Sequence, residues 1–136
     1  WMYDNIFKLV ETLGLAADVI FTGYVPRDEL KVFYNFADLS VYPSFYEGAG
    51  LPVLEAFKCG CPVVTSKVSS IPELAGDAAI LIDPGNPDSI ADGITNILKD
   101  KQLRDSLISK GLKRAAEFTW ERTARQMLEI FTDETR

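Results

Sequence analysis

Short apolar runs alternate with longer amphipathic stretches along almost the whole sequence. The runs are rich in β-branched residues and predict strands at residues 19–22, 39–42, 62–66 and 78–82. The other stretches carry apolar residues at helical spacing and predict helices at about 3–13, from 28, 50–58, 71–74, from 88, 101–117 and from 119. This alternation predicts an α/β fold, a parallel sheet with helices on both faces. Ligands of such sheets bind beyond the carboxyl ends of the strands, where the turns at 23–26, 43–50, 66–70 and 83–86 should lie.

Residues 47–56, Glu-Gly-Ala-Gly-Leu-Pro-Val-Leu-Glu-Ala, form a small-residue turn that leads from a strand into a helix. The first turn of a helix has unpaired N–H groups and a positive dipole end, so it suits a phosphate. Glu47 precedes the helix and Glu55 lies about one to one and a half turns along it. The order of acid, amides and acid suits a sugar, a diphosphate and a nucleoside, because carboxylates accept hydrogen bonds from hydroxyls. The alternative is an ordinary helix start with two solvated glutamates.

Composition excludes several other classes of function. The net charge of −6 and a pI near 4.6 argue against a broad nucleic-acid surface, although they allow a small phosphorylated ligand. The chain has no histidine, so Ser-His and Cys-His nucleophile pairs are impossible within it. Cys59 and Cys61 flank a single glycine, and a disulfide across that span would be strained. We expect two reduced, buried cysteines in a cytoplasmic protein without a metal site.

The segment 47–56, followed by Gly60-Cys61-Pro62-Val63-Val64, resembles the donor-binding half of retaining glycosyltransferases of family 4, which have the GT-B fold. The resemblance covers most of the chain and includes residues 21–26, 70–73, 78–84 and 118–121. The commonest family residue at the position of Ala49 is Phe. Loss of that ring would alter the fit around the sugar, while the backbone N–H remains.

The resemblance implies a role for each residue of the turn. Glu47 would be the catalytic residue and contact hydroxyls of the transferred sugar near the reacting carbon. Backbone groups of Gly48, Ala49, Gly50 and Leu51 would bind the sugar and the diphosphate. The Glu55 carboxylate would bind the ribose hydroxyls, so these five residues are the predicted donor-binding residues of the motif.

Two further segments carry open alternatives. The turn at Tyr24 and Val25 would hold the base, largely through its backbone, and simple turn packing is the alternative reading. Ser69, Ser70 and Glu73 either border the same cleft or form a capped loop. Lys67 is expected to be a solvated charge at the ligand edge, and Trp120 a core or interdomain anchor.

The resemblance also implies the reaction and the partners. A hexosyl group would move from a nucleotide-diphosphate sugar to an acceptor hydroxyl with retention, and the enzyme would stabilise the leaving diphosphate. Neither a metal nor another cofactor is expected. The alternative is a glycosyltransferase-like binding or assembly module that has no turnover on its own.

Residues 1–136 are expected to form a single donor-binding domain that is a fragment of a two-domain enzyme and is inactive in isolation. The chain begins at Trp1 and lacks the acceptor-binding half. It also lacks the first two strands of the donor half, which in the family lie between the strands predicted at 19–22 and 39–42 and bring an Arg/Lys pair for the diphosphate. We expect the remainder elsewhere in the protein, in another chain, or through strand exchange between copies. The resemblance is compatible with membrane association of the full enzyme.

Overall fold

The structure, a computed structural model, describes residues 4–133. Its strands are β1 (Ser40–Tyr42), β2 (Val63–Ser66) and β3 (Ile80–Ile82). The helices before β3 are α1 (Asp4–Thr12), α2 (Arg27–Phe36), α3 (Leu51–Lys58) and α4 (Ile71–Ala75). The helices after it are α5 (Pro87–Lys99), α6 (Lys101–Ala116) and α7 (Trp120–Asp133). Gly14 and Gly60 follow α1 and α3 with a φ of 69°, the left-handed conformation that commonly ends a helix.

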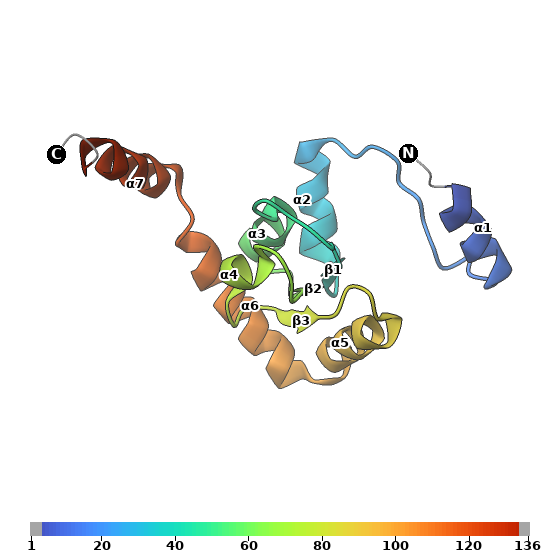
Figure 1. Cartoon of the computed structure of the whole chain (residues 1–136). Helices are drawn as coiled ribbons and strands as arrows, with labels where there is room; N and C mark the ends of the chain where they lie inside the picture. Colours follow the sequence, from blue (N-terminus) through green and yellow to red (C-terminus); the bar gives the residue numbers. More distant parts are fainter. Residues whose placement is uncertain (1–3, 134–136) are drawn as a thin grey trace.

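The three strands form one parallel sheet in the order β1-β2-β3 (Figure 1). Ser40 pairs with Val63 in the first ladder, and Val64 pairs with Ile80 in the second. The central strand β2 is fully buried, as expected for a strand covered on both faces. The predicted parallel α/β architecture is therefore confirmed.

Two groups of buried side chains cover the two faces of this sheet. The α3 cluster joins the sheet to α3, α4 and the end of α6; it comprises Val53, Leu54, Ala56, Phe57, Cys61, Val63, Ile71, Leu74, Ala75, Ala78 and Ala115. The α5 cluster joins the opposite face to α5 and the middle of α6; it comprises Val64, Ile82, Ile97 and Leu107. Val63 and Val64 fall in different clusters because successive residues of a strand point to opposite faces.

The first and last helices extend away from this central body, on opposite sides of it (Figure 1). Both are amphipathic as predicted, but their apolar faces are largely exposed within the described residues; examples are Ile6, Leu9, Leu128 and Phe131. The ring of Phe7 in α1 lies 4.3 Å, centroid to centroid, from that of Phe21. Helix formation was thus predictable from periodicity, whereas burial requires surfaces that residues 4–133 do not provide.

The prediction of a strand at residues 19–22 is wrong. This segment is irregular, and Ile20 and Phe21 are 85% and 47% exposed. A β-rich run becomes a strand only when another strand offers it a ladder of hydrogen bonds, and none does so within residues 4–133.

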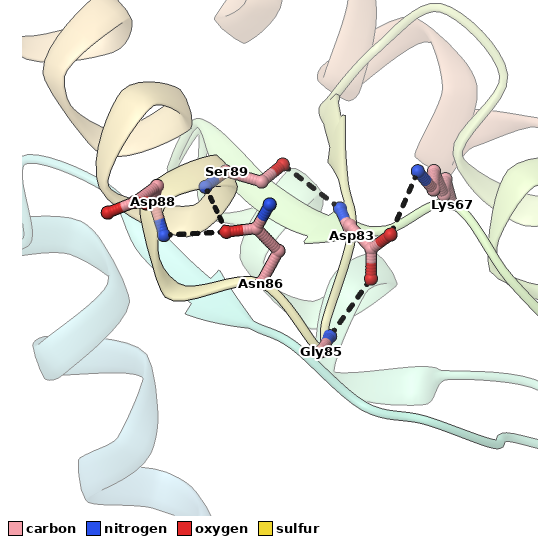
Figure 2. Close-up of polar contacts among 6 residues, drawn as sticks. All are labelled: Lys67, Asp83, Gly85, Asn86, Asp88 and Ser89. Carbon is pink, nitrogen blue, oxygen red and sulfur yellow. Dashed lines mark hydrogen bonds and ion pairs between the residues drawn. The ribbon is translucent and has the colours of Figure 1, made fainter.

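A helix cap that was not predicted from the sequence lies after β3, where Asn86 is the N-cap residue of α5 (Figure 2). Its side-chain oxygen accepts hydrogen bonds from the N–H groups of Asp88 at 3.0 Å and Ser89 at 3.3 Å. The Ser89 hydroxyl in turn accepts the Asp83 N–H at 3.1 Å, so the cap also fixes the end of β3.

Replacing Asn86 by Ala is expected to lower the free energy of unfolding by about 1 kcal/mol, because two N–H groups lose their acceptor. Urea denaturation of both proteins measures this change. Asn96→Ala is the matched control, since Asn96 lies exposed inside α5 and caps nothing. An equal loss of stability in both variants would contradict the capping role.

Candidate functional site

Three loops meet at one edge of the sheet, because the strands are parallel and their carboxyl ends lie together. They follow β1 (residues 43–50), β2 (67–70) and β3 (83–86). The predicted turn at 23–26 does not follow a strand within residues 4–133, so no strand places it at this edge.

The loop after β1 leads into α3 through Gly50, which adopts a left-handed conformation with φ 70° and ψ 44°. A Cβ built on Gly50 would lie 2.4 Å from Cδ1 of Ile71, so the turn needs glycine for both conformation and space. Within the described residues, the N–H groups of Ala49, Gly50 and Leu51 have no hydrogen-bond partner. Gly48, Ala49 and Leu51 are exposed, so this helix start is open to a ligand.

The Glu47 carboxylate lies just before that helix start and is oriented by two hydroxyl groups. Its Oε1 accepts one hydrogen bond from the Tyr42 hydroxyl and another from the Ser44 hydroxyl at 2.9 Å. These bonds, the Tyr42 bond first, hold the pKa of Glu47 below its ordinary value. The same bond to Glu47, together with burial, raises the pKa of Tyr42 to about 12. Glu47 is therefore an oriented carboxylate, rather than a freely solvated one.

The backbone of Glu47 is held by the loop after β2. Its N–H donates to the Ser69 hydroxyl at 3.1 Å, and its carbonyl accepts the hydroxyls of Ser69 and Ser70, both at 2.8 Å. Ser69 adopts a φ of 60°, which is uncommon outside glycine. These serines were predicted either to border the cleft or to cap a loop. In the structure they connect the loop between β2 and α4 to the backbone of Glu47.

Buried hydroxyls of β2 fix the segment between β1 and Glu47. The Thr65 hydroxyl donates to the carbonyl of Tyr42 at 2.8 Å, and the Ser66 hydroxyl donates to the carbonyl of Ser44. Both β2 side chains are fully buried, and these bonds satisfy them. Six hydroxyl groups from three segments thus determine where Glu47 lies.

A hollow of about 440 Å³ opens beside the turn, bordered by Gly48, Ala49 and Ser70 on one side. The junction of α6 and α7 borders its other side. There Arg114 donates hydrogen bonds to the carbonyls of Glu73 and Leu74, and its guanidinium lies 5.0 Å from the centroid of the Phe118 ring. Arg114 therefore ties α6 to the end of α4.

Glu55 projects from α3 toward α2, where its carboxylate lies 3.6 Å from the Arg27 guanidinium. With Tyr34 and Leu30 these residues line a second, more apolar hollow. Burial, and then the charge of Glu55, raise the pKa of the Tyr34 hydroxyl. The two acids of the motif therefore have different surroundings, one held by hydroxyls and the other beside a cation.

The Tyr24 side chain is 91% exposed, and Val25 is half-buried in the segment before α2. The structure places them in the connection to α2, and no described contact distinguishes base binding from turn packing. Their role stays a prediction.

Lys67 and Asp83 lie at the ends of β2 and β3 and form an ion pair at 3.1 Å (Figure 2). A carboxylate oxygen of Asp83 also accepts the Gly85 N–H at 3.0 Å. The Gly85 bond and then Lys67 hold the pKa of Asp83 below its ordinary value. Lys67 is half-exposed, as predicted, but it is paired across the strand ends.

Both cysteines are free thiols, as predicted, with Cys61 buried and Cys59 half-buried. Burial raises the pKa of Cys61 to about 11, so this thiol stays protonated and unreactive near neutral pH. Within residues 4–133, no group of three or more metal-binding side chains is placed to hold an ion. In the same part of the chain, no helix is both long and apolar enough to cross a bilayer.

Tyr42 and Ser44 were not predicted as partners of Glu47. A weak signal existed, since a partly buried tyrosine requires a partner for its hydroxyl, and Glu47 is the nearest carboxylate after it. The hydroxyls of β2 gave no such signal, because their partners depend on how β1 and β2 pair.

A parallel sheet with an oriented carboxylate and an open helix start at its carboxyl edge defines a nucleotide-binding type of α/β domain. The chain belongs to the glycosyl transferases group 1 family, whose model matches residues 2–114. Its α/β fold matches one part of longer GT-B glycosyltransferase chains, as predicted from the sequence.

The named relatives are longer proteins than this chain. The O-antigen chain mannosyltransferase B of Escherichia coli is 41% identical over 131 residues, which are 96% of this chain and 34% of the relative. The D-inositol 3-phosphate glycosyltransferase of Corynebacterium urealyticum is 32% identical over 126 residues, or 91% of this chain and 30% of the relative. The chain thus spans about a third of the length of these relatives.

Solved structures agree with this assignment. Sucrose-phosphate synthase from Thermosynechococcus elongatus matches with a TM-score of 0.85 and 31% identity, over 96% of this chain and 34% of that one. Anabaena HepE, in a crystal structure with UDP and glucose, matches with a TM-score of 0.84 and 25% identity, over 95% of this chain and 36% of that one. The C-terminal domain of a glycosyl transferase group 1 family protein from Francisella tularensis matches with a TM-score of 0.73 and 29% identity, over 83% of this chain and 60% of that one.

Proposed function

We propose that this chain is the donor-binding part of a retaining glycosyltransferase that moves a hexosyl group from a nucleotide-diphosphate sugar to an acceptor hydroxyl. The observation that carries the proposal is the oriented Glu47 carboxylate beside the unpaired N–H groups at the start of α3. A related structure that holds UDP and glucose supports a donor of this chemical class.

Glu47 would accept hydrogen bonds from hydroxyls of the transferred sugar. The N–H groups of Ala49, Gly50 and Leu51 would bind the diphosphate, and Glu55 would bind the ribose hydroxyls. Arg27 lies close enough to Glu55 to limit its side-chain freedom before the ribose binds. Tyr24 and Val25 would border the base.

In the transfer step, the bond between the anomeric carbon and the diphosphate oxygen breaks, and its electron pair leaves with the diphosphate. The acceptor oxygen forms its bond to the anomeric carbon from the same face, and its proton passes to the departing diphosphate oxygen. The helix start stabilises the charge that develops there. The proposal needs no metal and no other cofactor.

The acceptor is proposed to bind a second domain, in the rest of the protein or in another chain. Within residues 4–133 β1 pairs with one neighbour only, which leaves its outer edge available to strands from that source or from a second copy. A cytoplasmic location, with or without membrane association of the whole enzyme, is part of the same proposal.

Isothermal titration of the chain with a panel of nucleotide-diphosphate sugars and free nucleotides tests donor binding. We expect heat from nucleotide sugars, weaker binding of nucleotide sugars and free nucleotides by Glu55→Ala, and little transfer by the chain alone. Adding the acceptor-binding part should restore transfer. Binding of donors without any transfer in the combined protein would favour the binding module, and no donor binding in that protein would overturn the proposal.

A further inference from the structure

The two hydrogen bonds to the Glu47 carboxylate converge on one of its oxygens. Tyr42 and Ser44 both donate to Oε1, and within the described residues Oε2 accepts no hydrogen bond. A carboxylate can accept bonds at both oxygens, so this arrangement leaves one oxygen for a ligand.

Tyr42 is itself held rigidly. It is the last residue of β1, its half-buried ring packs against the α3 cluster, and its carbonyl accepts the buried Thr65 hydroxyl. Ser44 is fixed in the same way, because its carbonyl accepts the Ser66 hydroxyl. The backbone of both donors is therefore anchored by hydroxyls of the buried strand β2, and not by the exposed turn that carries the carboxylate.

We propose that Tyr42 is a positioning residue for Glu47: with Ser44 it holds Oε1, so that Oε2 faces the hydroxyls of the donor sugar. This inference rests on the proposed function, since it assigns the sugar to that oxygen. It predicts that Tyr42 affects the sugar end of the donor and not its nucleotide end.

The protonation of Glu47 provides an independent readout. Removing the Tyr42 hydroxyl removes the main cause of its lowered pKa, so the pKa should rise. The remaining influences are the Ser44 hydroxyl and burial, while Lys67 and Asp83 at the neighbouring strand ends pair with each other. If transfer requires the ionised Glu47 carboxylate, activity should then fall at a higher pH on the acid limb of the pH profile.

Tyr42→Phe in the enzyme that contains this chain and its acceptor-binding part tests the proposal. We expect kcat to fall about tenfold, the acid limb of its pH profile to move to higher pH, and affinity for the free nucleoside diphosphate to stay unchanged. In the 136-residue chain, NMR titration of the Glu47 carboxyl should show a raised pKa. Ser44→Ala should act in the same direction.

Tyr46→Phe is the matched control, because it also removes a tyrosine hydroxyl beside Glu47. Tyr46 is 82% exposed. This variant should keep the parent values. An unchanged pH profile and Glu47 pKa in Tyr42→Phe would overturn the positioning role. If Glu47→Gln also left transfer intact, the proposed function itself would fail.

Discussion

Replacing Glu47 by Gln is expected to reduce transfer by roughly 10²–10³-fold in the complete enzyme, a loss typical of removing one group that stabilises a transition state. Gln keeps the shape of the side chain and a carbonyl oxygen that can still accept the bonds from Tyr42 and Ser44. The negative charge beside the reacting sugar is lost. Steady-state kinetics with the natural donor measures the effect.

The folded state of this variant should remain close to the parent, because the oxygen that receives both hydroxyls is retained. A thermal unfolding midpoint near that of the parent would show that the loss is chemical. Glu11→Gln is the control for a change of charge alone, since Glu11 is exposed on α1, away from the sheet edge. Transfer by Glu47→Gln within twofold of the parent would contradict the role of Glu47.

Replacing Gly50 by Ala is expected to destabilise the chain by about 2–5 kcal/mol. Part of this cost is the left-handed conformation, which costs residues other than glycine about 1–2 kcal/mol. The rest arises because the new methyl group would lie 2.4 Å from Cδ1 of Ile71, and overpacking of this kind costs about 1–3 kcal/mol. Urea denaturation measures the loss.

Gly48→Ala is the matched control in the same turn. Gly48 does not adopt a positive φ, and a Cβ built on it meets nothing within 4 Å. Its substitution should change stability by less than about 0.5 kcal/mol. If the two variants were equally stable, the turn would not depend on the conformation of Gly50.

The helices and the three strands of the sheet were predictable, because their signals are local. Apolar spacing marked α1 through α7, and buried β-branched runs marked β1, β2 and β3. The segment 19–22 carries the same strand signal and yet forms none. Whether this segment forms a strand depends on a neighbouring strand to pair with, and the local sequence does not indicate whether one is present.

The candidate site was predictable in part for the same reason. Glu47, Gly50 and Glu55 lie in one contiguous motif whose helix start the residues themselves indicate. The bonds that hold the backbone of Glu47 join residues 22 or 23 positions apart, because they come from Ser69 and Ser70. Such bonds depend on strand register and loop conformation, so no pattern of spacing in the sequence reveals them.

Helix α6 reaches both faces of the sheet, since Leu107 belongs to the α5 cluster and Ala115 to the α3 cluster. Any opening that separates α6 from one face therefore also loosens the other. The central body between β1 and the end of α6 should exchange its amide hydrogens as a single cooperative unit, with one common free energy of opening. The exposed helices α1 and α7 share neither cluster, so their amides can exchange through local fraying at a much lower cost.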